Sequence, residues 1–202
     1  MKLFTGLVAI LLAGTAWADD GGFTRLFNGK DLTGWHLRKS VALSSWSVVD
    51  GVLKNTVEKG QHGVDLVSDG KFWNFTVKYE YMVPDGSNSG FYLRGRHELQ
   101  VLGDFAGGVV SKTGNGAIYN LKAPSEFASK AAGEWQTVEA TIIGNKITVI
   151  LNGKKIHDGV QCDRPTGSEL DNKVLEAGSF FLQGDHGTVS FRNILVKELE
   201  KE

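Results

Sequence analysis

The sequence is poor in residues that cross-link or rigidify a chain, with one cysteine and three prolines among 202 residues. With Cys162 alone no intrachain disulfide can form, so the fold must rest on its hydrophobic core. No pattern of His and Asn surrounds this cysteine. We therefore interpret Cys162 as a buried or incidental thiol rather than a nucleophile.

Neither sign of charge is in excess. Lys and Arg number 22 against 23 Asp and Glu, and the charges are scattered rather than gathered in blocks. This balance argues against nucleic acid or an anionic membrane surface as a partner. A neutral small molecule or a glycan fits the composition better.

The sequence also lacks an apolar run long enough to span a bilayer, which takes roughly 20 residues. The longest, Leu3 to Ala13, follows Lys2 and precedes Ala16-Trp17-Ala18, a small-x-small cleavage site. These are the parts of a signal peptide, so we predict that residues 1–18 are removed and that the protein is exported, periplasmic or secreted. No cysteine stands at the cleavage point, so neither a lipid anchor nor a membrane span is expected.

Glycine and aromatic residues are plentiful. The 26 glycines stand beside 11 Phe and 5 Trp, a composition that indicates aromatic-rich strands joined by tight turns. Short alternating runs recur, whereas helical apolar spacing is rare. We predict one all-β sandwich domain over residues 23–199. The expected strands are 45–49, 52–55, 72–82, 89–94, 98–102, 137–142, 146–151, 179–183 and 189–199.

Three dipeptides predict two-residue hairpin turns, because their residues tolerate positive φ: Asp50-Gly51, Gly144-Asn145 and Asn152-Gly153. The longest stretches without strand character are 105–133 and 157–177. Loops of this length are often functional. We expect the first to be able to rim a site and the second to be a solvated excursion.

The hairpin between Asn88 and Asp104 carries the candidate site. In strands, alternate side chains lie on opposite faces, so its apolar residues predict a core-facing side and its polar residues a second, shared side. The residues expected on that second side are Asn88, Tyr92, Arg94, Glu98 and Gln100. The alternative is an ordinary solvated face with a cross-strand Arg and Glu pair worth a few tenths of a kcal/mol. Planar polar side chains beside a Tyr favour a sugar-binding surface. The polar groups can form paired hydrogen bonds with vicinal hydroxyls, and the Tyr ring can cover the apolar face of a sugar ring.

A second polar cluster lies near the C-terminus, where Gln183 is expected to project with the polar face. Glycines flank Asp185 and His186 there and allow a sharp turn. A histidine at such a turn can act as acid or base, although a plain surface histidine is the simpler alternative. The other histidines, His36, His62, His97 and His157, show no metal-ligand spacing.

Seven motifs together resemble the 3-keto-disaccharide hydrolase domain family, and they cover nearly the whole mature chain. They are FNGKDLTGW (27–35), WSVVDGVL (46–53), NSGFYLR (88–94), HELQVLGD (97–104), GAIYNLKAP (116–124), GEWQTVEATIIGNKITVILNGKKI (133–156) and LQGDHGTVSFRNILVKEL (182–199). The resemblance implies a concanavalin A-like jelly-roll β-sandwich of two antiparallel sheets. It also implies cleavage of 3-keto-glycosides or 3-keto-disaccharides, with an oxidised carbohydrate as substrate.

Such a reaction has specific chemical needs. A ketone at C3 acidifies the hydrogen on C2, so a base can remove it, the glycosidic oxygen can leave C1 by elimination, and water can then add. For the base we consider Glu98 or His186, and for stabilising the enolate Arg94. For substrate binding we consider Asn88, Tyr92, Gln100 and Gln183, and Tyr119 could assist the leaving group. A divalent metal could assist the enolate, although no ligand motif supports one, and a partner enzyme could oxidise the sugar first.

Two other functions stay open. Jelly rolls of this type also act as carbohydrate-binding modules or lectin-like proteins, which would keep the fold and lack the chemistry. A third interpretation is an interaction or envelope protein with a vestigial site. Turnover of a keto-sugar, as opposed to binding of an unoxidised one, separates the enzyme from both.

Overall fold

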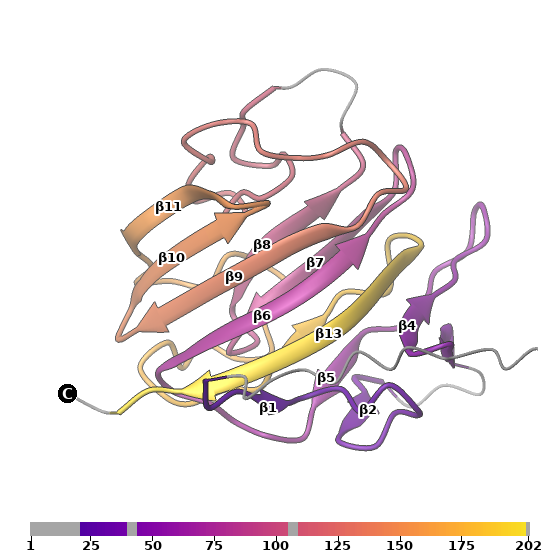
Figure 1. Cartoon of the computed structure of the whole chain (residues 1–202), viewed down its shortest axis with the longest axis horizontal. Helices are drawn as coiled ribbons and strands as arrows, with labels where there is room; N and C mark the ends of the chain where they lie inside the picture. Colours follow the sequence, from indigo (N-terminus) through magenta and orange to yellow (C-terminus); the bar gives the residue numbers. More distant parts are fainter. Residues whose placement is uncertain (1–20, 40–43, 105–108, 201–202) are drawn as a thin grey trace, which may run out of the picture.

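The computed structural model describes residues 21–39, 44–104 and 109–200, and within these ranges it contains strands and no helix. The strands form two antiparallel sheets, which Figure 1 shows as two layers. The large sheet has the order β11-β10-β9-β6-β13-β4-β3, with β1 beside β13, and the small sheet has the order β2-β5-β12-β7-β8. The strands are β1 (Thr24–Arg25), β2 (Trp35–Leu37), β3 (Trp46–Val49), β4 (Val52–Asn55), β5 (Leu66–Ser68), β6 (Phe75–Met82), β7 (Asn88–Leu93), β8 (His97–Leu102), β9 (Gln136–Ile143), β10 (Lys146–Leu151), β11 (Lys154–Gln161), β12 (Phe181–Leu182) and β13 (Val189–Glu198).

The core is the space between the two sheets, and aromatic side chains fill much of it. Strand β6 alternates buried and half-buried residues along its whole length, as expected for a strand with one face on the core. Its Tyr79 stacks on Phe91 of β7 with ring centroids 3.9 Å apart, so the two sheets meet through these rings. Burying a large apolar side chain is worth about 1.5–3 kcal/mol, and this contact therefore helps to hold the sheets together.

The hairpin made by β7 and β8 is confirmed, and its apolar residues face the core as predicted. Phe91 and Leu93 are fully buried, and Leu99 and Val101 are almost so. The tight turns are also confirmed: Asp50 and Gly51 join β3 to β4, and both adopt positive φ. These turns fix the register of the hairpins that they close.

The strand predictions fail where strands are short or irregular. Strands β1, β2 and β5 have two or three residues each and were not expected. Strand β11 enters the stretch predicted to lack strands, because its pairing with β10 shifts register twice and so breaks simple alternation. The strand expected from Phe72 begins at Phe75, and Phe72 makes only an isolated bridge to Gly178.

The predicted signal peptide, residues 1–18, lies outside the described residues. Within the described part of the chain, no helix is long and apolar enough to cross a membrane.

Candidate functional site

The outer face of the small sheet gathers most of the predicted site residues, and strand register explains how. Tyr92 of β7 lies between its partners Phe181 of β12 and Glu98 of β8. Two residues along β7, on the same face, Gly90 pairs with Gln100, and its carbonyl accepts a hydrogen bond from the backbone N–H of Gln183. Two cross-strand rows therefore place Glu98, Gln100 and Gln183 around a glycine.

Glu98 occupies the centre of this face and is almost completely buried, at 3% exposure. The Tyr92 hydroxyl donates a 2.7 Å hydrogen bond to Oε2 of Glu98. The other oxygen, Oε1, lies over Gly90, where a Cβ atom would overlap it. Glycine at this position leaves the room that the carboxylate needs.

Burial is the main cause that raises the pKa of Glu98 to about 7. The hydrogen bond from Tyr92 and the charge of His186 act in the opposite direction, whereas the charge of Asp185 raises the pKa further. A carboxyl group with a pKa near neutrality is suited to taking and returning a proton.

Gln100 and Gln183 flank the carboxylate and present amide oxygens. The amide nitrogen of Gln100 donates to Asn88 Oδ1 at 3.3 Å and to the carbonyl of Thr113 at 3.2 Å, which fixes the orientation of this amide. Its Oε1 and that of Gln183 are buried without a hydrogen-bond partner in the described part of the chain. Buried acceptors left unpaired are costly, so both oxygens suit a ligand with hydroxyl donors.

The turn after β12 brings a histidine to the same face. His186 and Asp185 are half-exposed, and Nδ1 of His186 bonds the carboxylate of Asp185. Nδ1 of His62 lies 3.2 Å from the Asp185 backbone carbonyl. Because the charges of Asp185 and His186 both act on the pKa of Glu98, the turn brings an imidazole and a second carboxylate into electrostatic range of the buried carboxylate.

Tyr119 lies at the free edge of β8. Its neighbour Ile118 pairs with Leu99, and the backbone N–H of Tyr119 donates a 3.0 Å hydrogen bond to the carbonyl of Glu98. Ile118 shares the core side with Leu99, so Tyr119 falls on the outer side with Glu98. Backbone register therefore places Tyr119 beside Glu98 on the outer side of the sheet.

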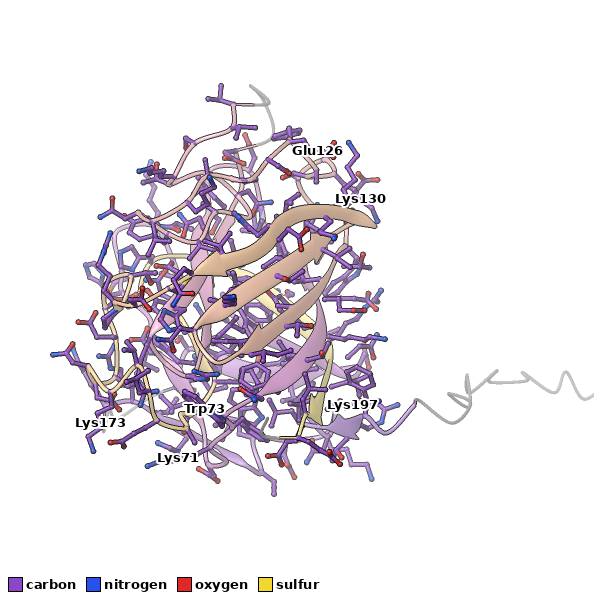
Figure 2. The ribbon with its side chains drawn as sticks, turned by 90° about the vertical axis from the view of Figure 1, so that its left-hand side faces the viewer. Lys71, Trp73, Glu126, Lys130, Lys173 and Lys197 are labelled. Carbon is purple, nitrogen blue, oxygen red and sulfur yellow. The ribbon has the colours of Figure 1, made fainter. Side chains whose placement is uncertain are left out.

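Arg94 does not join this face, and the expectation that it would sit with Glu98 and Gln100 is wrong. Strand β7 ends at Leu93, and Arg94 adopts φ of 54°, so the alternation that would have aimed it outward stops one residue earlier. Its guanidinium lies 3.7 Å from the centre of the Trp73 ring and donates to the carbonyls of Trp73 and Gly144 at 2.7 and 2.8 Å. Figure 2 shows Trp73 near Lys71 and Lys173, at the end of the sandwich opposite Glu126 and Lys130.

Arg38 is the cation that sequence reasoning missed. It lies 5.1 Å from the centre of the Phe181 ring, and Phe181 in turn stacks on Tyr92. Its guanidinium bonds Asp65 at 3.3 Å and the carbonyls of Ser168 and Glu169 at 2.9 Å. Arg38 thus fastens a loop from the predicted solvated excursion onto the small sheet, and only the pairing of the short strands β2 and β5 brings it there.

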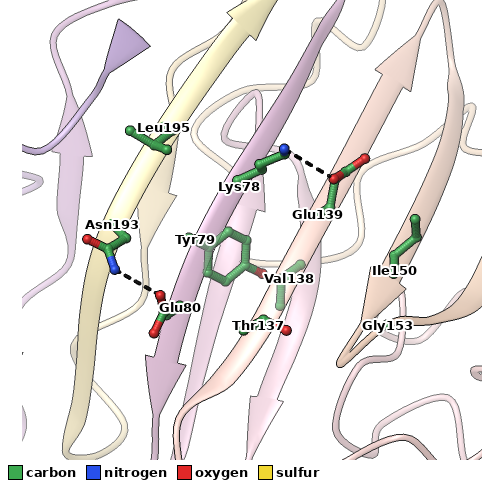
Figure 3. Close-up of a pocket in the computed structure, with 10 residues that line it drawn as sticks. All are labelled: Lys78, Tyr79, Glu80, Thr137, Val138, Glu139, Ile150, Gly153, Asn193 and Leu195. Atoms are coloured by element: carbon green, nitrogen blue, oxygen red, sulfur yellow. Dashed lines mark hydrogen bonds and ion pairs between the residues drawn. The ribbon is translucent and has the colours of Figure 1, made fainter. Parts of the chain in front are cut away.

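The outer face of the large sheet offers a different hollow, of about 350 Å³, which Figure 3 shows. Its charged groups satisfy one another: Lys78 lies 3.6 Å from Glu139, and Asn193 donates to Glu80 at 2.8 Å. Lys78 and Glu139 are more than 40% exposed. Paired, solvated charges of this kind are typical of a sheet surface, so we place the candidate site on the small sheet.

The described residues hold no cluster of three or more His, Cys, Asp or Glu side chains that could hold a metal ion. Cys162 is fully buried, and burial raises its pKa to about 12, which agrees with the inert thiol expected from the sequence.

Comparison of the sequence with known proteins identifies the family of this chain. The profile of the family described as the 3-keto-alpha-glucoside-1,2-lyase-like domain matches residues 22–197. The chain belongs to this family. A 3-keto-disaccharide hydrolase from Bacteroides thetaiotaomicron is 37% identical over 82 residues, which are 37% of this chain and 28% of that protein. The chain thus matches less than a third of that relative's length, and the family resemblance predicted from the motifs is confirmed.

Solved structures agree on the fold of this family member. A provisionally assigned glycosyl hydrolase from Parabacteroides distasonis superposes with a TM-score of 0.72 at 29% identity, covering 89% of this chain and 84% of the other. The carbohydrate-binding module CBM66 from Bacillus subtilis superposes with a TM-score of 0.51 at 15% identity over 83% of this chain and 98% of the module, a likeness of fold alone. The predicted concanavalin A-like jelly-roll sandwich is confirmed.

Proposed function

We propose that this protein cleaves glycosides carrying a ketone at C3, with Glu98 as the base at C2 and His186 as the acid at the leaving oxygen. The observation that carries the proposal is the state of Glu98, a buried carboxylate with one oxygen bonded to Tyr92 and the other over Gly90. The family supports a glycoside-acting protein, and the named relative supports a keto-sugar as substrate.

The proton transfers assign each group a task. Glu98 Oε1 removes the C2 hydrogen, and the electron pair moves to the C3 oxygen as an enolate. When the enolate collapses, the C3 carbonyl re-forms, a C1–C2 double bond forms, and the C1–oxygen bond breaks. His186, hydrogen-bonded through Nδ1 to Asp185, protonates the departing oxygen from Nε2. Water then adds its hydroxyl at C1 while its proton goes to Nε2 of His186, and Glu98 returns its proton to C2, which restores both groups and completes a net hydrolysis.

The amides hold the sugar while these steps occur. The unpartnered oxygens of Gln100 and Gln183 accept hydrogen bonds from ring hydroxyls, and Asn88, bonded to Gln100, sets the position of the first amide. Tyr119 borders the aglycone side by its place beside Glu98. Arg94 supports the site only through the hairpin end that it anchors.

Turnover of a 3-keto-glucoside, compared with that of the same glucoside unoxidised, tests this function. We expect Glu98→Gln to reduce kcat by on the order of 10²–10⁴-fold, which is what base catalysis supplies, because the amide cannot accept the proton. Glu139→Gln, on the outer face of the large sheet, is the matched control and leaves kcat unchanged. Equal turnover by wild type and Glu98→Gln would contradict the proposal, and a parallel assay with a chelator shows whether a metal takes part.

A carbohydrate-binding module is the second candidate, and the likeness of fold to CBM66 is what favours it. Such a module binds the unoxidised sugar and turns over neither form. Calorimetric titration with the glucoside and its 3-keto form, followed by product analysis of the same samples, separates the two functions.

Export and supply of the substrate complete the proposal. We propose that residues 1–18 direct export and that an enzyme oxidising sugars at C3 precedes this one, because the C2 hydrogen is acidic only beside a ketone. The mass of the mature protein purified from the periplasm tests the first part, with cleavage after Ala18 as the expected result.

A further inference from the structure

We infer that Asn55 is a positioning residue that holds the Asp185–His186 turn at the correct place beside Glu98; this inference rests on the proposed function. Asn55 ends β4 in the large sheet and is fully buried. Its amide nitrogen donates two hydrogen bonds of 2.8 Å, one to the carbonyl of Gly184 and one to the carbonyl of Gly187. These two carbonyls bracket Asp185 and His186 in the chain.

The two bonds come from a single amide group, which few side chains could replace. An asparagine NH₂ has two donors in a fixed plane, whereas a serine hydroxyl has one and a carboxylate has none. The Oδ1 atom of Asn55 is buried without a partner among the described residues. All the side-chain hydrogen bonds of Asn55 in this part of the chain are thus directed at the turn.

Other contacts pin the same turn from the remaining sides. The backbone N–H of Gly184 donates to Asp65 Oδ1 at 3.0 Å. A Cβ atom on Gly184 would overlap the Val64 carbonyl, and one on Gly187 would overlap the Ser87 hydroxyl. The turn backbone therefore lies in close contact with both neighbours, and the Asn55 side chain ties it to the end of β4.

The side chains of the turn lack such support. Those of His186 and Asp185 are 48% and 43% exposed, and Nδ1 of His186 bonds only its sequence neighbour Asp185 within the described residues. Packing does not fix a half-exposed pair, so the backbone of the turn determines where the imidazole lies relative to Glu98. Removing the Asn55 bonds should leave the pair present and displace it.

A double-mutant cycle tests whether Asn55 acts through His186. We expect Asn55→Ala to lower kcat by about tenfold with KM within about twofold, and the same change in a His186→Ala background to cost less than about twofold. Asn74→Ala is the matched control, since Asn74 is also buried and accepts from the backbone N–H of Gly144 in a turn elsewhere. An equal loss from Asn55→Ala in both backgrounds, or an equal loss in Asn74→Ala, would overturn the inference.

A second measurement is independent of turnover. The ring signals of His186 in ¹H–¹³C spectra, assigned by their loss in His186→Ala, should move in Asn55→Ala and stay in place in Asn74→Ala. Unmoved signals overturn the positioning role, whatever the activity. If the His186 signals move in Asn55→Ala but His186→Ala keeps full activity, Asn55 remains a positioning residue and the role of His186 as the acid is overturned instead. If Asn55→Ala does not fold, Asn55→Ser, which keeps one donor, replaces it and should give a smaller displacement.

Discussion

The Tyr92 hydroxyl and the Glu98 carboxylate form a hydrogen bond of 2.7 Å across the β7–β8 pair, in a place where neither side chain is more than 3% exposed. The bond favours the ionised carboxylate, while burial favours the neutral one. The effect of burial on the pKa is the larger of the two, so the carboxyl group changes charge near neutral pH. The proposed chemistry depends on this balance.

Removing the Tyr92 hydroxyl should change the pH profile in a defined direction. Tyr92→Phe deletes the hydrogen bond that lowers the pKa of Glu98, so this pKa should rise above about 7. Because the base must be ionised, the acid limb of kcat/KM against pH should move to higher pH, by about one unit for a bond worth about 1.4 kcal/mol. A limb that stays in place or moves to lower pH would contradict this role of Tyr92.

Glu98 should also lower the stability of the folded protein at higher pH. Its pKa is raised from 4.5 to about 7 on folding, so between these values the folded state binds more protons than the unfolded state. Stability then falls as pH rises through this window, by up to about 3 kcal/mol. Urea unfolding at pH 5 and pH 8 should show this loss in wild type and in Glu139→Gln, and not in Glu98→Gln. The same pH dependence in all three proteins would show that Glu98 is not buried as described.

Gly90 should be needed for the position of the carboxylate. A Cβ atom there would overlap Oε1, Cγ and the carboxyl carbon of Glu98, so Gly90→Ala should push the side chain away from the substrate. We expect kcat to fall by about 10²-fold, as misplacing a catalytic group by about 1 Å can do. Steady-state kinetics on the 3-keto-glucoside measure the effect, and a Gly90→Ala enzyme with normal kcat would mean that the carboxylate acts from another position.

Arg94 should affect stability and not catalysis. Arg94→Ala leaves the carbonyls of Trp73 and Gly144 without their buried donor and removes the stacking on Trp73. We expect the free energy of unfolding to fall by about 3 kcal/mol, with the pH profile of the folded enzyme unchanged. A large loss of kcat at unchanged stability would instead support the catalytic role first expected from the sequence.

Part of this site could be predicted from the sequence because β7 and β8 are regular. Alternation there puts Tyr92, Glu98 and Gln100 on one face, and the structure agrees. Alternation fails at Arg94, where a positive φ ends the strand and redirects the side chain. The positive φ of Arg94 depends on how the end of the hairpin packs, and the alternation of apolar and polar residues in the sequence does not reveal it.

The remaining parts depend on contacts between distant segments. Asn55 lies about 130 residues before the carbonyls it binds, and its own strand gives no sign of this task. Arg38 reaches Phe181 through β2 and β5, which are too short to show a period. Gly90 could have been suspected, because an isolated glycine in a strand often marks a close approach.

Deuterium incorporation tests the central claim most directly. When the 3-keto-glucoside is cleaved in D₂O, Glu98 removes the C2 hydrogen, exchanges it with solvent while water enters the site, and returns deuterium to C2 of the early product, as seen by NMR and mass spectrometry. A sample of the product incubated without enzyme corrects for exchange in solution. Deuterium at C2 with wild type, and cleavage slowed by on the order of 10²–10⁴-fold with Glu98→Gln, is the predicted result. Cleavage that leaves hydrogen at C2, together with equal kcat/KM for substrate carrying hydrogen or deuterium at C2, would mean direct displacement at C1 and would contradict the account.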